Sequence, residues 1–129
     1  MDIDRPDVVA EVLAAFTDYE KALVANDAGA LGAWFWDSPA VTRFGLADRQ
    51  SGAAGLHAWR AAQPPLPAGR RLFETRVTTF GPDLATVTTL FDYPGEEDRP
   101  GRQSQTWVRL PPGWRIVHAH VSRPEGPAG

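Results

Sequence analysis

The second half of the sequence consists of four segments of strand-forming residues, each separated from the next by a turn that contains proline and glycine. These segments are rich in threonine, valine, phenylalanine and tryptophan, and they cover residues 71–80, 84–93, 102–110 and 114–122. The chain does not alternate strands with helices, as a parallel sheet would require. The four segments therefore predict sequential antiparallel strands.

The first half of the sequence is predicted to be mainly helical. Apolar side chains recur every three or four residues over 6–26, which indicates an amphipathic helix beginning at Pro6. Asp27 is expected to cap a second helix that ends at 37–39, and Ser51 is expected to cap a third over 52–62. Two short strands are expected between them, at 41–44 and before residue 51, and the proline-rich segment 63–67 stops the third helix.

Helices followed by antiparallel strands define an α+β fold. The 129 residues suit one domain, with a flexible polar tail at 123–129. Strand twist accumulates across a sheet of this size, and bulges turn the twist into curvature. A first helix about 30 Å long would cross the hollow face of such a sheet. We therefore expect a cone with one ligand pocket at its wide end.

Composition excludes several classes of function. The chain has no cysteine, which excludes disulfides, thiolate nucleophiles and cysteine-ligated metals. A net charge of −3 argues against binding to nucleic acid. The N-terminus lacks the features of a secretory signal, and no apolar run approaches the roughly 20 residues of a membrane span, so a cytoplasmic location is expected. Lys21 is the only lysine, and the other basic residues are arginines, which suit carboxylate or phosphate ligands.

Two residues in otherwise apolar patterns are candidates for chemistry. Tyr19 lies on the apolar stripe of the first helix, so its hydroxyl is expected to point inward; it could equally be an ordinary core tyrosine. Arg43 lies between Thr42 and Phe44 in a predicted strand. An arginine that faces the interior lowers the stability of the fold unless an anion pairs with it. It could also face solvent or pair with an internal carboxylate.

The last strand carries three polar residues at alternate positions, so His118, His120 and Ser122 share one face. No third ligand at a suitable spacing supports a metal site. Histidines here could serve in hydrogen bonding or proton transfer, or could simply be half-buried polar residues near the end of the sheet. Residues 102–106 place polar side chains, including Ser104 and Gln105, on both faces of a strand, which indicates either a cavity wall or a hydrated subunit contact.

Several segments together resemble a known family. They run in order along nearly the whole chain, and the most specific is Gly-Arg-Gln-Ser-Gln-Thr-Trp; they cover residues 18–23, 26–27, 34–36, 42–45, 101–107 and 118–122. In these residues the sequence resembles the AtzH-like proteins of the SnoaL-like and NTF2-like group, which include the oxalurate-catabolism protein HpxZ. The resemblance implies an NTF2/cystatin-like fold, a homodimer formed through the sheet, and a role beside amidases in the breakdown of ureido acids.

The resemblance also implies a function and a set of site residues. It suggests a decarboxylating amidohydrolase, without metal or cofactor, that acts on a small ureido or carbamoyl carboxylate such as a dicarboxyurea or oxalurate. Tyr19 and Arg43 match the family's active site, and His120 is expected to orient the ligand or relay a proton. Substrate-binding residues are expected at Trp36, Ser104, Gln105, His118 and Ser122. Residues 45–50 lack a glutamate expected in the family pattern, which leaves the contacts of that turn open.

Two other functions remain open from the sequence. The chain could be a non-catalytic partner of an amidase that binds a ligand or stabilises the enzyme. It could also be a SnoaL-like isomerase or dehydratase, which would need an inward carboxylate as base; Asp18 and Asp92 are the candidates.

Overall fold

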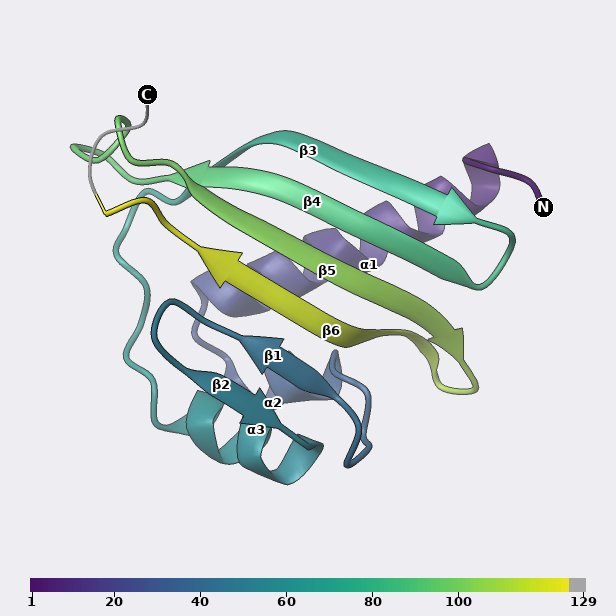
Figure 1. Cartoon of the computed structure of the whole chain (residues 1–129), viewed down its shortest axis with the longest axis horizontal. Coiled ribbons are helices and arrows are strands. Elements are labelled where there is room, and N and C mark those ends of the chain that lie inside the picture. Colours follow the sequence, from purple (N-terminus) through teal and green to yellow (C-terminus); the bar gives the residue numbers. More distant parts are fainter. Residues whose placement is uncertain (126–129) are drawn as a thin grey trace.

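The computed structural model describes residues 1–125 and contains a six-stranded sheet with three helices (Figure 1). In chain order the elements are α1 (Pro6–Val24), α2 (Ala28–Ala33), β1 (Thr42–Phe44), β2 (Arg49–Ser51), α3 (Ala53–Ala61), β3 (Arg71–Phe80), β4 (Leu84–Asp92), β5 (Gly101–Leu110) and β6 (Gly113–Ser122). The fold class is α+β, as predicted. Most of the tail predicted to be flexible, residues 126–129, lies outside the described residues.

The helix boundaries follow local chemistry. Helix α1 begins with a proline in its first turn and ends before Asn26, which adopts a left-handed conformation with φ 52°. The Asp27 carboxylate accepts a hydrogen bond from the amide of Ala30 at 3.1 Å and caps α2, which confirms that prediction. The cap predicted at Ser51 is wrong: this residue belongs to β2, and α3 starts after Gly52, whose φ of 89° suits glycine. Helix α2 ends at Ala33, earlier than predicted. Among the helices of residues 1–125, none has the length and apolar character needed to span a membrane.

The sheet has the strand order β2-β1-β6-β5-β4-β3. Strands β3 to β6 form the predicted antiparallel meander, whereas β1 pairs with β6 in parallel, a long-range pairing that local sequence patterns do not predict. The register shifts between Phe73 and Arg76 on β3, where Glu74 has φ 52°, and again at Thr106 and Trp107 on β5. Such bulges increase twist and bend the sheet.

Helix α1 crosses one face of this sheet, called the inner face below (Figure 1). The hydrophobic core of the domain is formed by fully buried side chains from the helices and from the inner face of the sheet, among them Val12, Leu31, Leu56, Trp107 and Ile116. The ring of Tyr19 packs edge-on against Trp107, with 6.4 Å between the ring centroids. The core thus ends in aromatic residues, and a cavity begins next to Tyr19.

Candidate functional site

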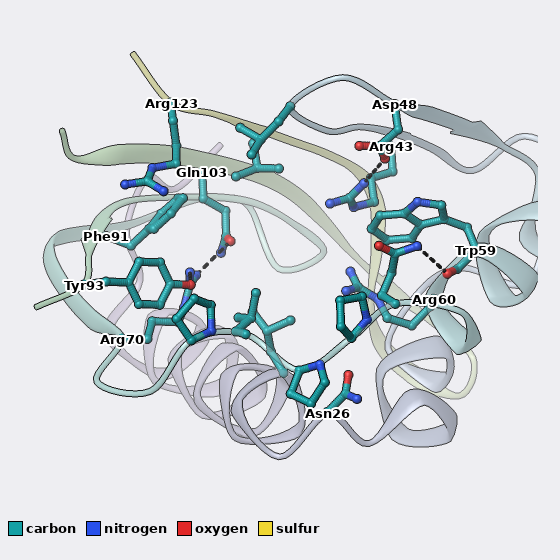
Figure 2. A pocket seen from close by; sticks show the side chains of 18 of the residues that line it. Asn26, Arg43, Asp48, Trp59, Arg60, Arg70, Phe91, Tyr93, Gln103 and Arg123 are labelled. Carbon is teal, nitrogen blue, oxygen red and sulfur yellow. Dashed lines mark hydrogen bonds and ion pairs between the residues drawn. The ribbon is translucent and has the colours of Figure 1, made fainter. Parts of the chain in front are cut away.

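A cavity of about 390 Å³ lies between the inner face of the sheet, helices α1 and α3, and the segment that follows α3 (Figure 2). This volume is in the range of roughly 300–1,000 Å³ typical of small-molecule sites. Much of the lining is apolar and includes Leu23, Leu46, Leu66, Val121 and prolines 64, 65 and 67. The proline-rich segment, predicted only to stop a helix, is therefore also a wall of the cavity.

Arg43 reaches the cavity because β1 pairs with β6 in a register that places it beside the buried Ala119. Its side chain is only 11% exposed, and its Nη1 donates to Asp48 at 2.9 Å and to Gln50 at 3.0 Å. Partial burial alone would raise the pKa of Asp48, but hydrogen bonds from Gln50 and the charge of Arg43 lower it overall. The turn after Arg43 thus supplies an aspartate as the partner of this arginine.

Arg60 reaches the same end of the cavity from α3, with its guanidinium 4.6 Å from the ring centroid of Trp59. Arg43 lies over the same ring, at 4.0 Å. Arg60 is only 7% exposed. Among residues 1–125, no group accepts a hydrogen bond from its guanidinium, and no carboxylate forms an ion pair with it. Burial lowers the pKa of Arg60, although a guanidinium stays charged at neutral pH. The cavity therefore contains a buried cation without a counterion.

Tyr19 projects from α1 into the cavity and is almost fully buried. Its hydroxyl makes no hydrogen bond to any of the described residues. Burial raises the pKa of this phenol well above its usual value, although the nearby positive charge of Arg60 acts in the opposite direction. Tyr19 is therefore a protonated hydrogen-bond donor facing the same space as two arginines.

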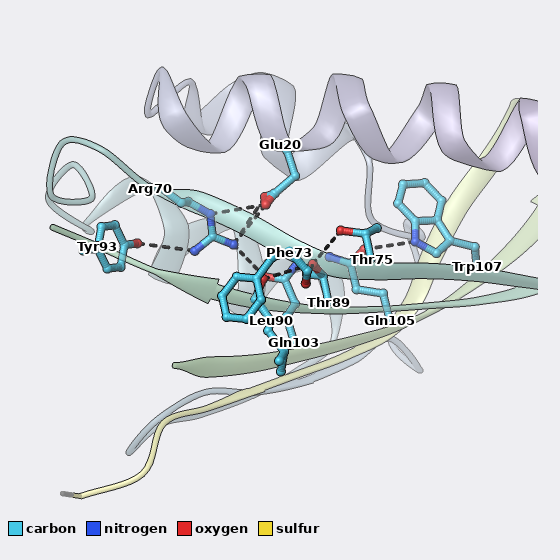
Figure 3. A network of polar contacts seen from close by, with 10 residues as sticks. All are labelled: Glu20, Arg70, Phe73, Thr75, Thr89, Leu90, Tyr93, Gln103, Gln105 and Trp107. Atoms are coloured by element: carbon cyan, nitrogen blue, oxygen red, sulfur yellow. Dashed lines mark hydrogen bonds and ion pairs between the residues drawn. The ribbon is translucent and has the colours of Figure 1, made fainter. Parts of the chain in front are cut away.

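The opposite end of the cavity carries a polar network around Arg70 (Figures 2 and 3). Arg70 donates to Glu20 at 2.9 Å, to the Gln103 side-chain oxygen at 3.2 Å and to the Tyr93 hydroxyl at 3.3 Å. Both charged side chains of the pair are buried, and burial raises the pKa of Glu20 despite the attraction of Arg70. This end is polar but has its cation paired.

The histidines and serines expected in the site lie elsewhere. Strand pairing places Ser104 opposite His120 and Arg102 opposite Ser122 on the outer face of the sheet, and His118 shares that face. The Thr42 hydroxyl and His118 Nδ1 are 2.8 Å apart. These residues do not line the cavity, which corrects the expectation that they share a site with Tyr19 and Arg43. Within residues 1–125, no three His, Asp or Glu side chains group closely enough to hold a metal.

Two further predicted residues also lie outside this cavity. Gln105 is buried and accepts a hydrogen bond from the Trp107 indole at 3.0 Å (Figure 3), and it is not among the residues that line the cavity. Trp36 lines a separate hollow of about 440 Å³ together with His57 and Arg115. Both expectations are corrected accordingly, since neither residue lines the cavity that contains Arg60.

The most important residue missed by sequence reasoning is Arg60. Its position was nevertheless detectable, because Ala53, Leu56 and Arg60 are spaced by three and four residues and form the buried stripe of α3. A residue with a polar group on an apolar stripe is the same pattern that identified Tyr19. Gln103 was overlooked for a different reason: it was one polar residue in a run that appeared polar on both faces.

Comparisons with known proteins agree with this fold. A sequence model described as AtzH-like matches residues 1–126. A crystal structure of a cystatin-like fold protein from Burkholderia xenovorans LB400 has 49% identity and a TM-score of 0.92, covering 98% of this chain and 99% of that one. A protein of unknown function from Pectobacterium atrosepticum SCRI1043 has 43% identity and a TM-score of 0.91, with 96% of each chain covered.

A more distant structure shows the fold alone. An NTF2-like protein of unknown function from Pseudomonas putida KT2440 has 19% identity and a TM-score of 0.79, covering 93% of this chain and 89% of that one. No curated protein matches the sequence.

Proposed function

The chain belongs to the AtzH-like family, and we propose that its cavity binds a small ureido or carbamoyl carboxylate and catalyses loss of the N-carboxyl group as carbon dioxide. The observation that carries this proposal is the buried guanidinium of Arg60, which has no anionic partner among residues 1–125. A buried charge of this kind is costly unless an anion compensates it. A carboxylate can accept two parallel hydrogen bonds from a guanidinium, which suits this position.

The proposed reaction uses the residues around that anion site. When carbon dioxide leaves an N-carboxyurea, the electron pair of the broken C–N bond stays on the ureido nitrogen. Tyr19 donates its proton to this nitrogen, which yields a neutral urea, and regains a proton from water. Burial raises the pKa of the Tyr19 hydroxyl, so the hydroxyl is protonated at neutral pH before the reaction. Arg60 and Arg43 stabilise the negative charge as it moves from the carboxylate to the nitrogen.

Arg43 has a supporting role that follows from its partners. Asp48 and Gln50 accept hydrogen bonds from its Nη1 and hold the guanidinium over the ring of Trp59, 4.0 Å from its centroid. A fixed guanidinium needs no rearrangement during the reaction, so its charge acts fully on the transition state. Its remaining N–H groups are available to the ligand.

The isomerase or dehydratase function receives less support, because it needs a free carboxylate as base. Asp18 is exposed on α1, and Asp92 forms an ion pair with Arg71. Asp48, which does line the cavity, is bound to Arg43. The amidase partner and the homodimer through the sheet stay predictions.

The first experiment measures binding by thermal melting with N-carbamoylglycine and oxalurate. The melting temperature should rise with ligand concentration. Replacing Arg60 with leucine should weaken binding by roughly 10- to 100-fold, which corresponds to losing charge-assisted hydrogen bonds. The matched control is Arg102→Leu, because Arg102 is an exposed arginine on the outer face whose side chain donates a hydrogen bond to Ser122. Equal loss in both variants, or no shift with any ligand, would refute the anion site.

The second experiment measures carbon dioxide release from N-carboxyurea. Tyr19→Phe should retain ligand binding and lose most turnover, by roughly 10²–10⁴-fold for loss of a general acid. Ligand binding without carbon dioxide release by the unaltered protein would instead favour the non-catalytic partner of an amidase.

A further inference from the structure

Trp59 lines the cavity but has no part in the proposed reaction (Figure 2). Its ring lies beside both cations at one end of the cavity: the guanidinium carbon of Arg43 is 4.0 Å from the ring centroid, and that of Arg60 is 4.6 Å away. A guanidinium within about 6 Å of an aromatic centroid is attracted to the electron-rich face of the ring, and tryptophan gives the strongest attraction of this kind. One indole therefore contacts two positive charges.

The two cations differ in what else holds them. Arg43 donates hydrogen bonds to Asp48 and Gln50, so its position does not depend on the ring alone. Arg60 has neither a hydrogen-bond acceptor nor a carboxylate partner among residues 1–125. Burial lowers the pKa of Arg60 most, and the like charge of Arg43 lowers it further. Within the described residues, the attractive side-chain contact of the Arg60 guanidinium is the ring of Trp59.

The backbone alone does not fix the position of this guanidinium. The end of α3 is held in place, because the carbonyl of Trp59 accepts hydrogen bonds from the Ala62 amide and from the Gln63 side chain, both at 3.1 Å. An arginine side chain nevertheless has many rotamers, and an unpaired guanidinium gains hydration when it turns toward solvent. The backbone therefore sets where the Arg60 side chain begins, and the contact with the indole sets where its guanidinium lies.

We propose that Trp59 is a positioning residue that holds the guanidinium of Arg60 in the cavity before the ligand binds. A cation that is already in place needs no ordering on binding, so more of its interaction with the ligand appears as affinity. Trp59 acts through Arg60 and does not need to contact the ligand. This inference rests on the anion site of the proposed function and adds the residue that organises it.

A double-mutant cycle tests whether Trp59 acts through Arg60. Titration calorimetry of the full chain with oxalurate measures the Kd of the unaltered protein, Trp59→Leu, Arg60→Leu and the double variant. Trp59→Leu should weaken binding by roughly 3- to 30-fold, the range of a cation–π contact. In the Arg60→Leu background the same change should weaken binding by less than about 2-fold, because the group that the ring positions is absent. Equal effects in both backgrounds would overturn the inference.

Fluorinated tryptophan separates the attraction between ring and cation from simple packing. Fluorine withdraws electron density from the face of the ring and changes its size little, so each added fluorine weakens the attraction. Site-specific replacement of Trp59 by monofluorinated and then by trifluorinated tryptophan should lower the affinity for oxalurate stepwise. The matched control is the same replacement at Trp36, a half-buried tryptophan that lines a different hollow, and it should leave the affinity unchanged. Unchanged affinity after fluorination of Trp59 would show that its ring only fills space.

The outcomes distinguish this inference from the proposed function. Absence of oxalurate binding by the unaltered protein would overturn the anion site and the inference together. Binding that is weakened by Arg60→Leu, and is insensitive to Trp59→Leu and to fluorination, would overturn the positioning role alone. If Arg60→Leu abolishes detectable binding, the fluorine series decides: a stepwise loss at Trp59 with none at Trp36 would support the positioning role.

Discussion

Arg43 Nη1 lies 2.9 Å from a carboxylate oxygen of Asp48, and this ion pair cancels one of the two positive charges at the reactive end of the cavity. The neighbouring Arg60 keeps its charge uncompensated within residues 1–125. We therefore expect the ion pair of Arg43 and Asp48 to limit the negative charge that this end of the cavity can compensate.

Neutralising Asp48 should change this charge preference. Asp48→Asn leaves Arg43 without its counterion, so the dicarboxylate succinate should bind several-fold more tightly, while the monocarboxylate butyrate should change less. The effect is limited because the Asp48 side chain is 36% exposed and water screens its charge. Titration calorimetry measures both affinities, and Glu97→Gln, at an exposed hairpin tip, is the control. Unchanged succinate affinity would contradict the charge argument.

Tyr19 should make the fold sensitive to alkaline pH. Burial raises the pKa of its phenol in the folded state above the usual value of about 10. The folded protein then holds this proton more tightly than the unfolded chain, so the stabilisation is complete below about pH 10 and is lost as the pH rises further. Urea unfolding at about pH 9 and about pH 11 measures the loss, which should be smaller in Tyr19→Phe. An identical alkaline loss in that variant would exclude Tyr19 as its source.

The buried pair of Glu20 and Arg70 should matter for stability. Glu20→Gln removes the charge that compensates Arg70, so the free energy of unfolding should fall by about 3 kcal/mol. The control is Asp18→Asn, an exposed carboxylate on the same helix, which should change stability by less than about 0.5 kcal/mol. Chemical denaturation at neutral pH distinguishes the two. A loss below about 1 kcal/mol for Glu20→Gln would show that water enters this site.

Two glycines offer a matched test of packing beside the cavity. A Cβ atom at Gly101 would overlap the ring of Phe91, which lines the cavity, so Gly101→Ala should cost roughly 1–3 kcal/mol of stability. Gly55, inside α3, has no atom within 4 Å of such a Cβ. Gly55→Ala should therefore stabilise the protein by about 0.5–1 kcal/mol. Thermal and chemical denaturation measure both changes, and stabilisation by both substitutions would contradict the predicted overlap.

Much of the secondary structure was predictable because its causes are local. The turn signals predicted at 81–83, 94–101 and 111–113 match connections at 81–83, 93–100 and 111–112, and Asp27 caps a helix through its own side chain. Alternation along a strand correctly placed His118 and His120 on one face. This alternation does not indicate which face of the sheet the helices cover, so His118 and His120 were both wrongly predicted to line the cavity.

The sequence by itself determined the periodicities: the helical stripe containing Tyr19, the alternation that sets Arg43 apart from Thr42 and Phe44, and the order of helices before strands. Only the tertiary structure decided which of these residues meet. The parallel pairing of β1 with β6 brings Arg43 into the space bordered by Tyr19 on α1 and Arg60 on α3. Local patterns reflect the periods of strands and helices, which are two and about 3.6 residues. Bringing Tyr19, Arg43 and Arg60 together instead requires contacts between segments that are tens of residues apart in the chain, and burial of the whole hydrophobic core stabilises those contacts.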